Sequence, residues 1–209
     1  MLGFIRRSSL ETKDIEVRKS LYMSLVRSCL SYCSQVWAPQ SVTTLYSVER
    51  IQRRASKFIL SLPFRTDVSY KERLTKLRLL PLCYWHEYLD IVYLFKSMSS
   101  DPNISILNTA RTTRRTDPSR GTILNVPRSN TTLHQNNFYC RAPKVWNSLP
   151  PTLRNRNLSI DQFKKNLFSY YANLTKLYFD INLPQTFKTV CVKCHTCRPI
   201  ASLGSSLCC

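Results

Sequence analysis

Five of the nine cysteines lie within the last nineteen residues, and they are the side chains in this sequence best suited to hold a metal ion. Two thiols at C-x-x-C spacing, Cys191 and Cys194, can hold one zinc ion, and two further ligands complete a tetrahedral site. A bound zinc would fold this tail into a knuckle suited to single-stranded nucleic acid. The candidate ligands, four of which would bind the ion, are Cys191, Cys194, His195, Cys197, Cys208 and Cys209.

Three other interpretations of the tail stay open. It can be a disordered segment with free thiols, or an out-of-frame or degenerate stretch. Cys-x-x-Cys-His is also the attachment pattern for haem. The N-terminal stretch has no long apolar segment after its charges, so no secretory signal is predicted, and this disfavours haem.

Four basic residues of the helix predicted over 43–61 recur at i, i+3, i+4 and i+7: Arg50, Arg53, Arg54 and Lys57. Such a row shares one side of a helix and can follow a phosphate backbone, without choice of sequence and with a steep salt dependence. The alternative is a solvated helix face. Residues 111–120 carry four more arginines without interleaved aromatic rings and are interpreted as a disordered basic loop.

No catalytic arrangement of side chains is predicted. His86 lies in an apolar helical stretch, where a histidine is more often a core residue than a general base, and His134 lies in a polar loop. Three glycines are too few for a glycine-rich phosphate loop. The seven aspartates include no adjacent pair. We therefore expect no enzymatic activity, no magnesium site and no small-molecule substrate.

The charge balance favours a polyanionic partner. The chain carries 31 Lys and Arg against 12 Asp and Glu, for a net charge of +19. A field of this sign attracts nucleic acid, and the expected partner is RNA, DNA or an RNA–DNA duplex. The alternative is a protein that is merely basic. No window approaches the roughly 18–20 apolar residues of a membrane span, so we expect an intracellular protein, in the nucleus or cytoplasm.

Apolar residues at helical spacing predict four helices in the first half, over 15–32, 43–61, 69–79 and 83–98. Asp14 is the expected N-cap of the first helix, and Ser69 with Glu72 has the pattern of a capping box. The expected inward residues of the first helix are Val17, Leu21, Leu25 and Cys29, with Ile15, Tyr22, Val26 and Cys33 beside them. Those of the second are Leu45, Val48, Ile51, Ala55, Phe58 and Ile59.

The second half begins with a polar, Arg- and Pro-containing stretch that is interpreted as a loop, with a short strand over 123–126. Ser159 and Gln162 have a capping-box pattern that opens a last helix through Phe163 and Leu167. The predicted fold is mainly α: a helical bundle, a basic loop, a small mixed α/β segment with a helix, and a Cys-rich tail. The corresponding divisions are 1–100, 101–132, 133–175 and 176–209.

The tryptophans lie beside apolar periodic positions, so core packing is favoured over stacking on bases for Trp37, Trp85 and Trp146. Trp146 is expected to anchor its segment on the helices. The four cysteines outside the tail have apolar neighbours and are expected to be buried thiols: Cys29, Cys33, Cys83 and Cys140.

Several stretches occur in an order that is typical of one family. They are LGFIRR (2–7), SLVRSCLSYCSQVWAP (24–39), ERIQRRASKFIL (49–60), SYKERLTKLRLLPL (69–82), DIVYLFK (90–96), FYCRAPKVWNSLP (138–150) and SIDQFKKNL (159–167). Over about residues 2–170 the chain resembles the region that follows the polymerase core in reverse transcriptases of non-LTR (LINE-like) retrotransposons. Each stretch alone is a weak signal, and their order carries the resemblance.

The resemblance implies that residues 1–100 form a thumb-like bundle that grips a template–primer duplex through its phosphates. It favours phosphate contact by the basic row of 50–57 and adds Arg6 and Arg7 as weaker candidates. It also implies a C-terminal extension from about 103 onward. Catalysis in that family needs an aspartate pair and a third aspartate that hold two magnesium ions, and this chain has no such pair.

We therefore expect the nucleic-acid-binding part of an RNA-directed DNA polymerase, without its catalytic palm. Because the sequence starts inside the LGFIRR stretch, Met1 is interpreted as an internal methionine of a longer protein, in a truncated copy or a partial gene model. The alternative is an inactive retroelement remnant or a structural interaction domain with no activity of its own.

Overall fold

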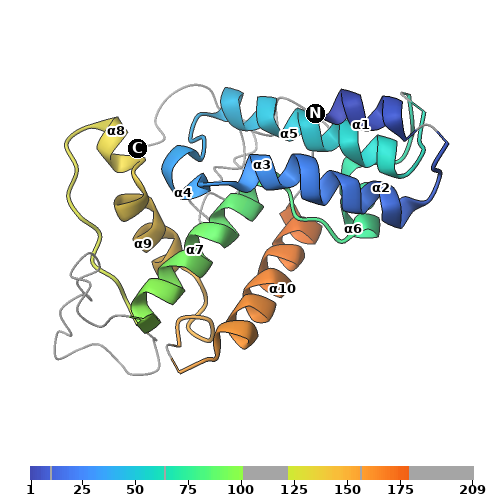
Figure 1. The fold of residues 1–209 in the computed structure, drawn as a ribbon. Helices are drawn as coiled ribbons and strands as arrows, with labels where there is room; N and C mark the ends of the chain where they lie inside the picture. Colours follow the sequence, from blue (N-terminus) through green and yellow to red (C-terminus); the bar gives the residue numbers. More distant parts are fainter. Residues whose placement is uncertain (10, 64, 101–121, 156, 179–209) are drawn as a thin grey trace, which may run out of the picture.

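Helix α7 (Leu82–Ser100) runs through the middle of the molecule, and the other helices lie around it (Figure 1). The computed structural model describes residues 1–9, 11–63, 65–100, 122–155 and 157–178. Within these ranges it is mainly helical, as predicted, and contains no strand. The helices that pack most extensively against α7 are α4 (Ser34–Trp37), α5 (Val42–Ile59), α9 (Phe138–Ser148) and α10 (Ile160–Tyr178).

The position of α7 follows from its sequence, because most of its residues are apolar and have to be covered by other helices, with Tyr93 and Lys96 left at the surface. Ile91 and Phe95 are both buried, at 0% and 2% exposure. The Phe95 ring stacks on Phe163 of α10, with 4.0 Å between centroids, and lies 6.3 Å from the Trp146 ring of α9. Trp146 is fully buried, and its indole N–H donates to Thr122 O at 2.9 Å. Its predicted anchoring role is confirmed.

The helix predicted over 15–32 is formed by α2 (Ile15–Leu21), the π-helical segment Tyr22–Arg27 and α3 (Ser28–Ser31). Asp14 caps it as predicted, and its carboxylate accepts a hydrogen bond from the Glu16 N–H at 2.9 Å. A π-helical turn contains more residues per turn than an α-helix, so it changes which side chains of the helix point toward the core.

The inward face predicted for this helix is confirmed in part. Tyr22 and Val26 are buried as predicted and Leu21 is half-buried, whereas Val17, Leu25 and Cys29 are exposed and Arg18 and Arg27 take interior positions instead. The two arginines take interior positions because their guanidinium groups lie over aromatic rings. Arg18 is 4.7 Å from the ring centroid of Phe58, and Arg27 is 4.4 Å from that of Trp85. A long side chain buries its aliphatic stem in this way while the charge keeps a favourable partner.

Helix α6 (Tyr70–Leu77) packs against α5, and α1 (Leu2–Ser8) packs against α5 as well (Figure 1). The predicted capping box opens α6: Glu72 N–H donates to Ser69 Oγ at 3.2 Å, and Ser69 N–H donates to Glu72 Oε2 at 3.3 Å. The helix ends at Arg78, whose φ of 51° is left-handed. A local capping box thus sets the start of α6, and a residue in a left-handed conformation follows its last turn.

After the undescribed residues 101–121, an extended stretch is held by the side chains of α9. The Asn147 amide accepts from Leu124 N–H at 2.9 Å and donates to Leu124 O at 2.8 Å, so one side chain satisfies both backbone groups of Leu124. The short helix α8 (Thr132–Gln135) precedes α9. Ser159 Oγ accepts from Gln162 N–H at 3.3 Å at the start of α10, as the predicted cap requires. One hydrophobic core runs from Ile5 of α1 to Tyr171 of α10.

Candidate nucleic-acid interface

Two arginines of the predicted basic row stand out from the surface of α5. Arg50 and Arg54 are exposed and lie one helical turn apart. Neither forms an ion pair with an acidic residue in the described part of the chain. Arg6 and Arg7 are also exposed, in the last turn of α1, the helix that packs against α5. The structure therefore brings the two sets of predicted residues onto neighbouring helices.

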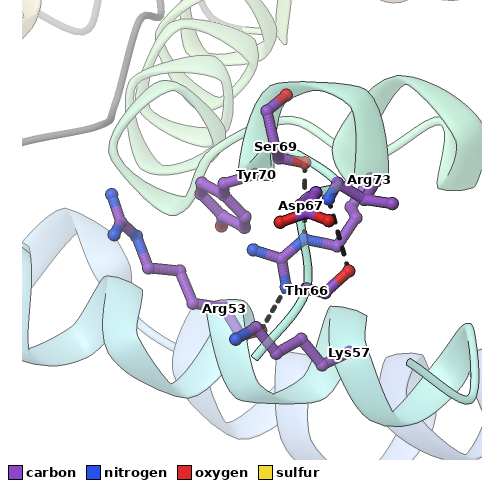
Figure 2. A pocket seen from close by; sticks show the side chains of 8 residues that line it. Arg53, Lys57, Thr66, Asp67, Ser69, Tyr70 and Arg73 are labelled. Atoms are coloured by element: carbon purple, nitrogen blue, oxygen red, sulfur yellow. Dashed lines mark hydrogen bonds between the residues drawn. The ribbon is translucent and has the colours of Figure 1, made fainter. Parts of the chain in front are cut away.

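The other two residues of the row, Arg53 and Lys57, are half-buried and line an open pocket between α5 and α6 (Figure 2). The remaining lining residues come from the loop before α6 and from its first turn. Figure 2 shows the Tyr70 ring between the guanidinium groups of Arg53 and Arg73. The full lining is Arg53, Lys57, Thr66, Asp67, Val68, Ser69, Tyr70 and Arg73.

Arg53 is held by aromatic rings and not by acceptors. Its guanidinium carbon lies 4.9 Å from the Tyr70 ring centroid and 5.6 Å from that of Tyr46. Nε and Nη2 of Arg53 are buried and donate to no acceptor within the described residues. A buried donor without an acceptor costs about 1–3 kcal/mol, and more when it is charged. Two donors of the Arg53 guanidinium therefore lack an acceptor within the described residues, and an anion would reach them only if the side chains that cover them moved.

Arg73 fixes the opposite wall of the pocket. Its Nη1 donates to Arg53 O at 3.1 Å and to Ser56 Oγ at 3.2 Å, and its Nε donates to Ser69 O at 3.4 Å. Burial, together with the nearby Arg53 charge, lowers the pKa of the Arg73 guanidinium. Burial and the charges of Arg73 and Arg53 likewise lower the pKa of the Lys57 ammonium. Three positively charged side chains, Arg53, Lys57 and Arg73, therefore line the same pocket.

A buried polar network joins Tyr70, a lining residue of the pocket, to α5. The Tyr70 hydroxyl donates to Glu49 and accepts from Gln52 Nε2 at 3.1 Å. Glu49 Oε2 also accepts from Leu82 N–H at 2.8 Å, and Tyr22 donates to Gln52 Oε1 at 2.9 Å. Burial raises the pKa of the Glu49 carboxyl. This network explains why Glu49 and Gln52 face inward on α5. The apolar pattern predicted that Val48 and Ile51 would face inward, and both are half-buried.

Sequence reasoning missed the part of the pocket that α6 supplies, namely Ser69, Tyr70 and Arg73. The SYKER stretch correctly predicted where α6 begins, so the presence of an arginine one turn later was visible. The contact between Arg73 and Arg53 could not be predicted, because twenty residues separate the two arginines and the contact depends on how α5 and α6 pack.

Part of the basic charge is structural and does not reach the surface, since Arg18, Arg27, Arg73 and Arg154 are buried. Arg18 and Arg27 donate to backbone carbonyls of other segments, Arg18 to Phe58 O at 2.9 Å and Arg27 to Leu80 O at 3.4 Å. Net charge alone therefore overstates the positive charge that a nucleic acid can meet.

The remaining predicted residues have mixed outcomes. His86 is a core histidine, as predicted: it is 3% exposed, its Nε2 lies 2.7 Å from Leu30 O, and burial lowers its pKa. The prediction of core packing is wrong for Trp37, the last residue of α4, which is 39% exposed. Trp85 is half-buried and stacks on Tyr88.

The prediction of four buried thiols is half wrong. Cys83 and Cys140 are buried, whereas Cys29 and Cys33 are exposed. Cys29 faces outward because the buried arginines occupy the inner side of its helix, and Cys33 lies at a left-handed turn with φ of 51°. The zinc ligands predicted in the tail and the arginines of 111–120 lie outside the described residues.

The described residues contain no group of three or more His, Cys, Asp or Glu side chains that is placed to hold a metal ion. Within the same part of the chain, no helix combines the length and the apolar character that crossing a membrane requires. In comparisons with known proteins, no family model, no curated protein and no solved structure matches this chain.

Proposed function

We propose that this chain binds nucleic acid through phosphate groups, without choice of sequence, as the thumb and post-thumb part of a retrotransposon RNA-directed DNA polymerase. In this proposal the chain has no catalytic palm, and its partner is RNA, DNA or an RNA–DNA duplex. The observation that carries the binding proposal is the exposed pair Arg50 and Arg54 on α5, together with the exposed Arg6 and Arg7 of α1, the helix that packs against α5. The order of the family-like sequence stretches between residues 2 and 170 supplies the polymerase context.

The chemistry of arginine suits this role. A guanidinium keeps its charge at every physiological pH and can donate two parallel hydrogen bonds to one phosphate. Each phosphate that is neutralised releases counterions, so the logarithm of the binding constant falls with the logarithm of the salt concentration, with a slope of about −0.9 per contact on duplex DNA. Affinity from such contacts does not depend on the base sequence.

The double variant Arg50→Gln/Arg54→Gln tests the proposal, because both side chains are exposed and their loss should leave the fold intact. Fluorescence anisotropy with labelled RNA–DNA duplexes of several sequences should show a uniform loss of affinity. The salt slope should become shallower by about 2, as expected for two lost phosphate contacts. The matched control is Lys164→Gln/Lys165→Gln, which removes the same charge from the start of α10, away from α5 (Figure 1).

Two results would contradict the proposal. One is equal loss in the variant and the control, which would mean that only net charge matters. The other is no binding by the wild-type chain at low salt, which is what an inactive remnant or a structural interaction domain predicts.

A further inference from the structure

The pocket between α5 and α6 is lined by more basic than acidic residues. Three of its eight lining residues are basic, and a single one, Asp67, is acidic. Within the described residues neither Arg53 nor Arg73 forms an ion pair. A concave space with this charge raises the local concentration of anions.

The donors around this space are of the kind that binds a tetrahedral oxyanion. Arg53 offers a guanidinium whose orientation is already fixed by Tyr70 and Tyr46. The two hydroxyl groups on the rim accept hydrogen bonds from backbone N–H groups: Thr66 Oγ1 from Val68 at 3.3 Å and Ser69 Oγ from Glu72. A hydroxyl that accepts in this way keeps its own proton to donate.

We propose that this pocket is a seat for one phosphate group, contacted by Arg53 and Lys57 and by the hydroxyl groups of Thr66 and Ser69. Arg73 is a positioning residue, since its hydrogen bonds to Arg53 O and Ser56 hold α6 against α5. The phosphate belongs either to a nucleic-acid strand, in which case the inference rests on the proposed function, or to free phosphate. On a strand, a seat of this kind fixes one phosphate in place and so sets the register of the strand on the protein.

The first experiment uses inorganic phosphate and the full chain, without nucleic acid. The melting temperature is measured in sodium phosphate and in sodium chloride of equal ionic strength. Phosphate should raise it for the wild type, and the rise should be lost in both Arg53→Gln and Lys57→Gln. Circular dichroism reports whether each variant is folded, and the use of two variants guards against one that is not. Lys165→Gln, outside the pocket, should respond as the wild type does.

Asp67 provides a variant that should act in the opposite direction. Its exposed carboxylate lines the pocket and repels an anion there. Asp67→Asn should therefore bind phosphate about two- to five-fold more tightly, the size expected for one exposed charge at close range. Equal melting temperatures in phosphate and chloride for the wild type, or an undiminished response in both pocket variants, would overturn the proposal.

The second experiment identifies the source of the phosphate with short oligonucleotides that carry a 5′-phosphate or a 5′-hydroxyl. A preference for the 5′-phosphate that disappears in Arg53→Gln assigns the seat to a strand end. If the two oligonucleotides bind with equal affinity and Arg53→Gln weakens both equally, the bound group is an internal backbone phosphate. No oligonucleotide binding, with phosphate still stabilising the chain, assigns the seat to free phosphate.

The two proposals can fail separately. If Arg50→Gln/Arg54→Gln binds nucleic acid as the wild type does while phosphate still stabilises the chain, the phosphate seat stands and the proposed function falls. If that double variant loses nucleic-acid affinity while Arg53→Gln and Lys57→Gln change neither response, the proposed function stands and the seat falls.

Discussion

The Arg141 guanidinium donates from Nε to the Asp90 carboxylate at 2.8 Å, and this contact joins α9 to α7 in the interior. The two side chains are 11% and 5% exposed. The same guanidinium donates to the carbonyl oxygens of Asn136 at 2.9 Å, Gln35 at 3.0 Å and Ser34 at 3.2 Å. One arginine thus connects α4, α7 and α9.

Replacing this arginine should destabilise the fold strongly. Arg141→Met leaves the Asp90 carboxylate buried without its partner, and removing one member of a buried pair costs about 3–5 kcal/mol. Urea unfolding followed by circular dichroism measures the change in the free energy of unfolding. Lys164→Gln is the control, since it breaks an ion pair with Asp161 whose side chains are 38% and 88% exposed. It should cost less than about 1 kcal/mol. Equal losses for the two variants would argue against a buried charge at Asp90.

Glu87 should make stability depend on pH near neutrality. Its Oε2 atom is buried on α7, and burial, offset in part by the Tyr171 hydroxyl, raises the pKa of Glu87 to about 8. An unfolded chain releases this proton near pH 4.3. The folded chain therefore holds the proton in the interval between the two values. The stability it contributes is complete below about pH 4.3 and is lost as the pH rises through about 8.

The measurement compares the wild type with Glu87→Gln, which cannot titrate. Between about pH 6.5 and 8 the free energy of unfolding of the wild type should fall by about 2 kcal/mol relative to the variant, because one bound proton gives about 1.4 kcal/mol per pH unit. Glu16→Gln, at an exposed position, should follow the wild-type profile. Parallel profiles for the wild type and Glu87→Gln would mean that Glu87 ionises normally.

Arg78 offers a stabilising substitution. It is exposed and ends α6 with φ of 51° and ψ of 44°, a left-handed conformation that a side chain disfavours by roughly 1–2 kcal/mol. Glycine adopts this conformation freely at the end of a helix but costs more entropy on folding. Arg78→Gly should therefore raise the free energy of unfolding by about 0.5–1 kcal/mol.

The matched control places glycine two residues earlier. Lys76→Gly lies inside the last turn of α6, where glycine should cost about 1 kcal/mol. Thermal and urea unfolding of both variants should give changes of opposite sign. A destabilised Arg78→Gly would mean that the arginine side chain makes a contribution larger than the backbone strain.

Helix positions and caps were predictable from the sequence because their causes are local. Asp14, Ser69 and Ser159 each accept hydrogen bonds from backbone N–H groups within three residues, so the pattern that predicts the cap also builds it. Which side of a helix faces inward was less predictable. Arg18 and Arg27 are buried because rings from distant segments receive their guanidinium groups, and no spacing of apolar residues encodes that.

The candidate site was predictable to the same extent. The spacing of Arg50, Arg53, Arg54 and Lys57 placed four cations on one side of α5, and the structure keeps them there. It divides them into an exposed pair and a pocket pair, because α6 packs beside Arg53 and covers part of it. The sequence pattern did not predict this division, because the contacts of Arg53 with Tyr70 and Arg73 depend on how α6 packs against α5.

The central position of α7 also has a consequence for synthesis of the chain. Phe95 leaves the ribosome before Trp146 and Phe163, the rings that cover it, have been made. At about 5–20 residues per second, the stretch from the end of α7 to the end of α10 takes roughly 4–16 s to translate. For that time the apolar residues of α7 have no covering partners from α9 and α10. A nascent chain stalled before α10 should therefore recruit chaperones or aggregate, while one released after α10 should not.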